Sequence, residues 1–585
     1  GAGYHNTLYG YYAGRGITTG TRNTVIGSQT AYTAAANMNY SVVIGYSAAR
    51  YFANTADSNV IIGDNAAAVS VGCSNCVIIG QSAAVNNTAS DIIAIGVGAA
   101  TTNTSGTWNT AIGKYALFAN STGTSNTAIG HQAVTNGTGS KTTGVGYRAG
   151  YYFTSGDENT FIGYLAGFSS AAASTGTENT FIGSNSGAST SGITGSGNTT
   201  LGRFTLHNLT SGSHNTAIGH QANYVNSTGS HITAIGKDCL VNAYGDYNVG
   251  LGNYVLDTVT SGTANVGIGY AAGTQGGGTL NGTVLIGYQA GLNCDANYIV
   301  AVGYNALYSN TTGTQNTAIG FQASYYNDVG SYNTVVGHMA MGGGSVGTTR
   351  NRNTIMGRYA GYSISSGSYN SGYGMEALYA LTTGSYNTAL GYYAANALQT
   401  GAYNVAIGQE PMAAAGTGVS NNIAIGYLAL RLALGGQNVA IGSFASYGGG
   451  SATSSENVAI GYGAAWQRTD GKDSVYIGAY AGYAAGTGSY NTAVGKEAGY
   501  SLTTGQKNTF IGQSAGSNVT SGENNTCLGW DADTPSNSTT NTVVLGNSAV
   551  SSLQCQVQTI SALSDERDKT NIKDSNYGLD LIDSL

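Results

Sequence analysis

Apolar and polar positions along this chain repeat about every 17 residues. A motif of the form Asn-Thr-Ala-Ile-Gly, as at 316–320, or a close variant recurs along the chain, and its closing glycine appears 32 times between Gly10 and Gly546. The steps between successive glycines run from 16 to 20 residues, with 17 the commonest. Such a period is typical of a solenoid, in which each coil buries its apolar face against its neighbours. The pattern predicts an all-β, parallel β-solenoid (a β-roll or β-helix) of about 32 coils.

The residue before each closing glycine is apolar, and the residue two places earlier is mostly Thr or another β-branched residue. Because side chains alternate along a strand, these two positions share one face. We expect that face to point into the coil, with the inward residues including Ile129, Ile218, Ile319 and Ile425. The Asn that opens 23 of the motifs is expected to bond turn backbone or to form a ladder with the Asn of the next coil.

Two small residues mark the corner that follows each strand. The closing glycine predicts a backbone that needs a positive φ angle or a close approach of another chain segment. Ala stands three residues later in 26 repeats. This predicts a second inward position where only a methyl group fits.

The middle residue of the strand, between the two inward positions, is also apolar in most repeats, as at Ala128, Ala318, Val335 and Phe161. A strand that is apolar on both faces is usually buried on both. We therefore expect the Ala128 and Ala318 row to face outward and to form a chain-to-chain contact along a fibre, because a long apolar stripe is a liability on a monomer. The alternative is that small Ala residues tolerate exposure.

The composition favours a fibrous protein over a nucleic-acid-binding or membrane protein. Charged residues make up 8% of the 585 residues, against roughly 25% in ordinary globular proteins. A net charge of −7 without a basic run argues against nucleic acid and anionic membranes as partners. No stretch approaches the ~18 apolar residues of a membrane span.

The chain begins at Gly1 inside a coil, without an initiator Met or a signal peptide, so we expect a truncated sequence. At about 4.8 Å per coil, 31 steps predict a rod of roughly 150 Å.

Few residues suggest a metal site. Cys73 and Cys76 have the spacing of a zinc half-site, but no second pair or His partner lies in register, so a structural role is expected. Two pairs of identical residues occupy the same position on adjacent coils: His214 with His231, and Glu158 with Glu178. Either of those pairs offers only two ligands, which favours surface decoration over metal binding. No metal and no cofactor is expected.

Two rows that admit charged residues are expected to face water: the residue before the Asn and the residue after the glycine. Both are rich in aromatic residues on consecutive coils: Tyr369, Tyr386 and Tyr403 in the first row, and Tyr270, Tyr288, Tyr304 and Phe321 in the second. Stacked rings with a polar rim often bind sugars or other flat-faced ligands. The alternative is that ring stacking only stiffens the sheet.

The sequence indicates a structural protein rather than an enzyme. A glycosidase or lyase on a solenoid needs clustered carboxylates or an Arg and Lys constellation, and acidic residues here are spread thinly. The repeat predicts a shaft over residues 1–546. It is followed by an alternating neck strand over 547–563 and by a charged segment that opens a new unit at 564–585.

The charged segment resembles the start of the intramolecular chaperone domain at the C-terminus of phage tail spikes, tail fibres and endosialidases. Ser564, Asp565, Arg567 and Lys569 match the signature of that family. The resemblance implies a domain that trimerises the fibre and then cuts itself off between Leu563 and Ser564. In that reaction Ser564 is the nucleophile and Lys569 its base, with Asp565 and Arg567 supporting the loop. A helix N-cap at Ser564 is the alternative role.

The coils themselves are similar to the head repeats of trimeric autotransporter adhesins, which form a parallel β-roll with shorter repeats. Both resemblances imply a homotrimer. The resulting hypothesis is a phage tail fibre on the virion that attaches to a host surface glycan or receptor. A bacterial cell-surface trimeric adhesin is the alternative. An ice-binding solenoid is more distant, because it needs exposed Thr rows and the Thr row is expected to face inward.

Overall fold

The computed structural model describes residues 4–33, 37–52, 57–170, 173–276, 278–344, 347–432, 434–448, 454–554 and 556. Over these residues the chain forms 32 β-strands, and no helix occurs among them. Each strand pairs in parallel and in register with the strand of the next coil, as in the pairing of Ala318 with Val335. The predicted parallel β-solenoid with one strand per repeat is therefore confirmed.

Every strand occupies the three positions before a closing glycine. The strands are β1 (Thr7–Tyr9), β2 (Thr24–Ile26), β3 (Val42–Ile44), β4 (Val60–Ile62), β5 (Val77–Ile79), β6 (Ile93–Ile95), β7 (Thr110–Ile112), β8 (Thr127–Ile129), β9 (Thr143–Val145), β10 (Thr160–Ile162), β11 (Thr180–Ile182), β12 (Thr199–Leu201), β13 (Thr216–Ile218), β14 (Thr233–Ile235), β15 (Val249–Leu251), β16 (Val266–Ile268), β17 (Val284–Ile286), β18 (Val300–Val302), β19 (Thr317–Ile319), β20 (Thr334–Val336), β21 (Thr354–Met356), β22 (Ser371–Tyr373), β23 (Thr388–Leu390), β24 (Val405–Ile407), β25 (Ile423–Ile425), β26 (Val439–Ile441), β27 (Val458–Ile460), β28 (Val475–Ile477), β29 (Thr492–Val494), β30 (Thr509–Ile511), β31 (Thr526–Leu528) and β32 (Val543–Leu545).

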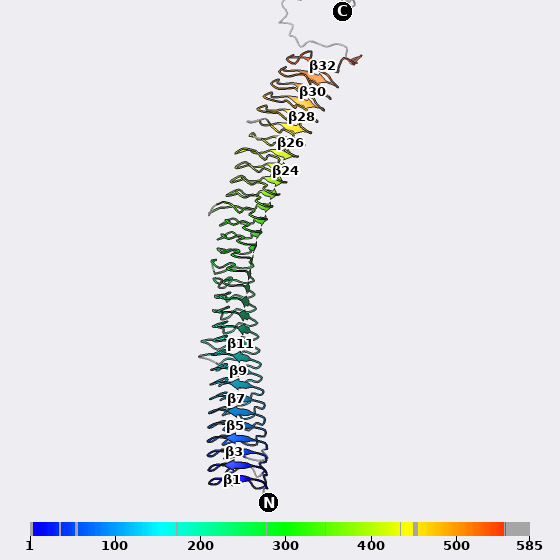
Figure 1. Cartoon of the computed structure of the whole chain (residues 1–585). Helices are drawn as coiled ribbons and strands as arrows, with labels where there is room; N and C mark the ends of the chain where they lie inside the picture. Colours follow the sequence, from blue (N-terminus) through cyan, green and yellow to red (C-terminus); the bar gives the residue numbers. More distant parts are fainter. Residues whose placement is uncertain are drawn as a thin grey trace, which may run out of the picture.

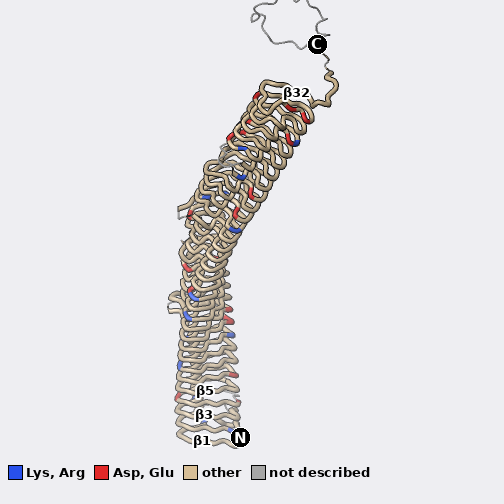
Figure 2. The backbone as a smooth tube through the Cα atoms, turned by 45° about the horizontal axis from the view of Figure 1, so that its top comes forward, with Lys and Arg blue, Asp and Glu red and all other residues tan. Residues whose placement is uncertain are grey.

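The stacked coils form a long, gently curved rod (Figure 1). Its strands lie above one another along one side, from β1 near the N-terminus to β32 at the other end. Lys, Arg, Asp and Glu are scattered thinly along the rod without a charged cluster (Figure 2). The last strand ends at Leu545, and the described residues that follow, 547–554 and 556, contain no strand. The described part of the proposed neck at 547–563 thus carries no strand.

The side chains of the strands alternate in the opposite sense to the prediction from sequence. From β2 to β31 the middle residue is buried, whereas the first and third residues are half-buried or exposed. Ala128 and Ala318 are fully buried, while Ile129 and Ile319 are 38% and 40% exposed. The predictions that the Ile row points inward and that the Ala row lies on an outer contact surface are therefore wrong. The correction also applies to the remaining Ile residues of that prediction, Ile218 and Ile425, which are half-buried on the outward face.

The narrow interior of the coil explains which row is inside. A three-residue strand sends one side chain inward, and that side chain is matched in size to the turns that face it. Phe161 packs against Gly150 and Gly167, and a Cβ atom at Gly150 would stand 2.5 Å from its ring. Conversely, where the middle residue is Gly144, the side chain of Val134 fills the space. Such exchange of large for small residues is typical of a close-packed core.

Both predictions for the corner are confirmed. Gly320 has φ 136°, and a Cβ atom there would collide with the carbonyl oxygen of Gly337 in the next coil. A side chain at this position is therefore excluded twice, by conformation and by space. Three residues later, Ala323 is fully buried, as are Ala133 and Ala306 in equivalent positions. The coil thus closes with a second inward row of methyl groups.

The Asn ladder is also confirmed, and it continues through consecutive coils. The side-chain Oδ1 of Asn370 accepts hydrogen bonds from the backbone N–H of Asn387, at 3.0 Å, and from its Nδ2, at 3.1 Å. Nδ2 of Asn387 also donates to the carbonyl oxygen of Gly401, at 2.9 Å. Asn404 bonds Asn387 in the same way. Each buried amide thereby ties the turn before one strand to the turns of its neighbours.

Candidate functional site

Aromatic side chains form stacked ladders on the surface of the rod, in both rows where the sequence predicts them. In the row after the closing glycine, the ring centroids of Tyr270 and Tyr288 lie 5.3 Å apart, and those of Tyr288 and Tyr304 lie 5.0 Å apart. Phe321 continues the stack at 5.3 Å from Tyr304, and His338 follows at 5.0 Å. The four predicted rings are each 41–46% exposed. The coil spacing thus sets the ring spacing.

The row before the Asn carries a second ladder. Tyr386 stacks between Tyr369 and Tyr403, at 4.8 Å and 4.9 Å, with interplanar angles of 7° and 2°. Arg352 extends the ladder by one coil, since its guanidinium carbon lies 5.3 Å from the Tyr369 ring centroid and 5.2 Å from that of Tyr332. Its Nη1 also donates to the hydroxyl oxygen of Tyr369, at 2.7 Å. A planar cation can therefore replace a ring in the stack.

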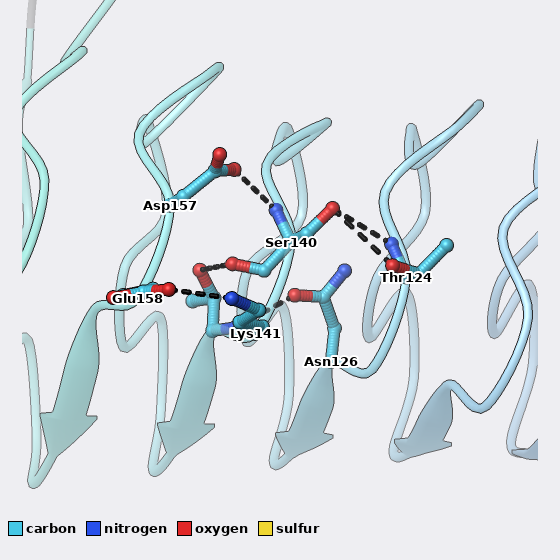
Figure 3. A network of polar contacts seen from close by, with 7 residues as sticks. Thr124, Asn126, Ser140, Lys141, Asp157 and Glu158 are labelled. Carbon is cyan, nitrogen blue, oxygen red and sulfur yellow. Dashed lines mark hydrogen bonds and ion pairs between the residues drawn. The ribbon is translucent and has the colours of Figure 1, made fainter.

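The same row accepts His and charged pairs. His231 stacks on His214 at 5.2 Å and on Tyr247 at 5.1 Å, so both imidazoles are rungs of an aromatic ladder. Lys141 forms an exposed ion pair with Glu158, with 2.6 Å between Nζ and Oε1 (Figure 3). Within the described residues, no three His, Cys, Asp or Glu side chains gather where they could bind a metal ion.

Figure 3 shows how polar side chains support the corner before the strand. The backbone N–H of Ser140 donates to Asp157, and Ser140 Oγ accepts from the backbone N–H of Thr124, at 3.1 Å. Two positions further on, Oδ1 of Asn126 accepts from the backbone N–H of Thr142, at 2.8 Å. These bonds run from coil to coil and fix the backbone that carries Lys141, Glu158 and the aromatic rungs of the same row.

A third aromatic row, which the sequence reasoning missed, lies five residues after the closing glycine. We call it the turn row. Its stacked pairs are His207 with Tyr224 at 5.0 Å, Tyr308 with Tyr325 at 4.8 Å, Tyr362 with Tyr379 at 5.4 Å, and Tyr483 with Tyr500 at 4.9 Å. Alignment of the repeats on the glycine would have revealed it, but the row is irregular and is interrupted by many non-aromatic residues, both small and apolar. Burial raises the pKa of Tyr325, and the neighbouring Tyr308 adds to this effect.

The outward residues of the strands form a separate surface, here named the outer sheet face, in which a row of mostly Thr and Val lies beside an apolar row of mostly Ile. It consists of the first and third residues of every strand, and none of them is charged. The third residue is isoleucine in 20 of the 32 strands. Leu201 and Leu390 are 50% and 49% exposed, and Ile511 is 45% exposed. The stripe runs the full length of the sheet and is unbroken by charge.

The predicted cleavage site lies outside the described residues. This applies to Leu563 and to all four residues of the proposed site, Ser564, Asp565, Arg567 and Lys569. Cys73 and Cys76 are buried free thiols in the coil interior, in line with the expected structural role.

Comparisons with known proteins give no family assignment. No protein-family model matches the chain, and no curated protein is significantly similar to it. No helix in the described part of the chain is long and apolar enough to cross a membrane.

Proposed function

We propose that this chain is the shaft of a homotrimeric attachment fibre of a phage tail. The observation that carries the proposal is the outer sheet face, which is uncharged along all 32 strands and carries an apolar or aromatic third residue in each of them. Monomeric soluble proteins rarely expose apolar patches larger than a few hundred Å². A stripe of this length therefore favours a chain whose outer sheet face is covered by another protein chain.

A second copy of the same chain is the best partner for this face. The coils repeat at the spacing of paired strands, about 4.8 Å, and a partner must match that repeat over the whole rod to stay in contact. A copy of the chain has the same repeat and the same length. The number of copies, three, is implied by the resemblance to the fibre chaperone and to trimeric autotransporter heads. The predicted oligomer contact is thus retained, but it moves from the Ala row to the Ile row.

We expect the wild-type rod to be trimeric at micromolar concentration and to dissociate when the outer sheet face carries charge. The test variant places Asp at six positions of the Ile row: Ile26, Ile112, Ile182, Ile268, Ile407 and Ile477. These side chains point out of the coil, so each coil should remain folded while the buried charges oppose association. Light scattering should report one third of the wild-type mass.

The control for this experiment carries Tyr369→Asn, Tyr386→Asn and Tyr403→Asn, which change the aromatic ladder in the row that precedes the motif Asn. Those rings are more exposed than the six Ile side chains but lie off the outer sheet face, so the control should remain trimeric. A monomeric wild type, or a trimeric six-Asp variant, would contradict the proposed assembly.

Attachment to a host surface is the second part of the proposal. Three aromatic rows present ring edges and hydroxyl groups along the rod, and ring faces where a ladder ends or is interrupted, and such faces suit the apolar face and polar edge of a sugar ring. The coils also hold these rings in fixed positions, which lowers the entropy cost of binding. These features favour a surface glycan over a peptide receptor. The alternative source, a bacterial cell-surface adhesin, would have the same shaft and the same ligands.

The third part of the proposal is maturation by a single self-cleavage. If the gene continues into the chaperone domain, the full-length product should be cut between Leu563 and Ser564. Attack of Ser564 Oγ on the Leu563 carbonyl needs a base to accept the hydroxyl proton, a role proposed for Lys569. The C–N bond then breaks as the Ser564 nitrogen takes up a proton, and water hydrolyses the resulting ester between Leu563 and Ser564 Oγ to release the two fragments. Intact-mass measurement should show two fragments for the wild type and one chain for Ser564→Ala. An uncut wild type, or equal cleavage of both proteins, would remove Ser564 from the mechanism.

The correction to the strand faces favours one second candidate, ice binding. The Thr row lies on the outer sheet face. The argument against ice binding from the sequence, that the Thr row faces inward, therefore no longer holds. Thr occupies the first strand position in eight consecutive strands, β7 to β14. Elsewhere the row is broken by Val, and its neighbour is a row of Ile rather than a second row of Thr, which makes association the better explanation. Thermal hysteresis of the trimer well above that of a buffer control would favour ice binding instead.

A further inference from the structure

At two of the places where the turn row lacks a ring, the surface is hollowed. In the first, Tyr325 and Tyr362 stand on coils two steps apart, and Gly342 occupies the turn row of the coil between them. A hollow of about 280 Å³ lies here and is lined by Gln322, Tyr325, Gly342 and Tyr362, among others. Two coil steps separate ring positions by about 9–10 Å, which leaves room for one more ring between them. The hollow thus has the dimensions of an absent rung.

A buried cation supports the floor of this hollow. Arg350 is fully buried, and its Nη1 donates to the carbonyl oxygen of Met341, at 2.6 Å. Its Nη2 donates to the carbonyl oxygens of Gly343, at 3.1 Å, and of Tyr326. Gly343 and Tyr326 both line the hollow. Burial lowers the pKa of Arg350 to about 10, so the side chain remains charged at neutral pH and holds these carbonyls in place.

The second hollow lies where the turn row ends. Tyr500 stacks on Tyr483 through one face, and the next coil carries Ser517 in the turn row. The hollow, of about 350 Å³, is lined by Tyr500 and Ser517 together with Glu497, Asn518 and Asp531. Its rim therefore offers two carboxylates, an amide and a hydroxyl group beside an aromatic ring.

We propose that each hollow binds one six-membered sugar ring, which stacks on tyrosine in the place of the absent rung. The inference rests on the proposed attachment to a surface glycan and assigns where on the rod the sugar binds. A pyranose has an apolar C–H face and hydroxyl groups on its edge. The face packs against Tyr500, and the hydroxyl groups donate to Glu497 and Asp531. Both hollows lie near the lower end of the roughly 300–1,000 Å³ range of small-ligand sites, which suits a single sugar residue.

Filling one hollow and removing the rings of the other tests the assignment. Ser517→Tyr adds the missing rung beside Tyr500, and Tyr325→Ala with Tyr362→Ala removes the walls of the first hollow. The three substitutions are combined in the full chain, and the matched control is Tyr308→Ala with Tyr379→Ala, which removes turn-row rings one coil further from the first hollow. All these residues are partly exposed, so thermal unfolding should be nearly unchanged.

Saturation-transfer difference NMR with methyl glycosides of glucose, galactose, mannose and N-acetylglucosamine measures binding. At least one glycoside should show transfer to its ring C–H protons in the wild type and in the control. The transfer should be about tenfold weaker in the triple variant, because loss of a stacked ring removes most of the contact. The single variant Ser517→Tyr should lose part of the signal, which keeps the test valid if the triple variant unfolds.

Three results would overturn the inference: no transfer to any glycoside, equal transfer in wild type and triple variant, or transfer to p-cresol in place of the sugars. The last would indicate that the hollows take aromatic side chains. A host-cell binding assay separates this inference from the proposed function. If the triple variant binds cells as well as the wild type while a Tyr270, Tyr288 and Tyr304 triple-Ala variant does not, attachment through glycan stands and the hollows are not its site.

Discussion

Replacing Ala318 with Asp should unfold the coils around β19, whereas the same change at the neighbouring Ile319 should be tolerated. Ala318 is fully buried and pairs in register with Ala301 and Val335. A carboxylate there would have no partner in a narrow apolar interior, at a cost of roughly 3–5 kcal/mol. Ile319 is 40% exposed in the single chain, so Ile319→Asp should cost the folding of the coil itself about 1 kcal/mol or less, and its larger effect should be on association.

Chemical denaturation and limited proteolysis would measure both effects. Because each coil contacts mainly its neighbours, the damage from Ala318→Asp should appear as new cleavage sites in the coils on either side of residue 318. Ile319→Asp is the matched control, since it places the same charge one residue away on the opposite face. If Ile319→Asp were the damaging change and Ala318→Asp the mild one, the Ile row would have to be inside the coil.

Replacing Asn387 with Ala should destabilise the folded rod strongly, although less than Ala318→Asp does. Asn387 is 1% exposed, and its side chain bonds Gly401 O, Asn370 Oδ1 and two groups of Asn404. The Ala variant removes these bonds and leaves buried polar groups without them, at a cost of roughly 2–4 kcal/mol. Thermal unfolding and hydrogen exchange at the backbone amide of Asn404, which donates to Asn387 Oδ1, would report the loss.

Asn387→Ser is the matched control, because the solenoid already uses Ser at this position of another coil. Oγ of Ser474 accepts a hydrogen bond from the backbone N–H of Asn491, at 3.1 Å, and so preserves the bond to the next coil. The Ser variant should therefore retain about half of the stability that Ala loses. Equal destabilisation by Ser and Ala would show that the amide nitrogen, rather than the acceptor oxygen, holds the ladder.

The signal for the correct strand face was present in the sequence, but in the co-variation of residue sizes rather than in hydrophobicity. Phe161, in the middle row, is accompanied by glycines at 150 and 167, and Gly144 in the same row is accompanied by Val134. Positions that exchange volume with one another share a core. The Ile row shows no such exchange and stays nearly constant, as expected for a ladder on a regular outer surface.

The proposed sites were predictable to different degrees. The ladders of Tyr270 to Phe321 and of Tyr369 to Tyr403 follow directly from the repeat, because residues at equal positions in stacked coils must lie one coil spacing apart. The two hollows do not follow from it. They depend on which rings of the turn row are absent and on the buried side chain of Arg350, which holds backbone from several turns together.

The sequence by itself determined the period, the number of coils, the place of each strand, the glycine corners and the Asn ladder, because each of these depends on local spacing that repeats along the chain. The hydrophobic pattern left open which face of the strand is inside, and the tertiary structure decided it. A three-residue strand with apolar residues on both faces satisfies the hydrophobic pattern in either orientation. The volume enclosed when the coil closes decides which face is inside. Ala128 fits that volume beside the alanines that stand three residues after each closing glycine, whereas Ile129 lies on the outer sheet face.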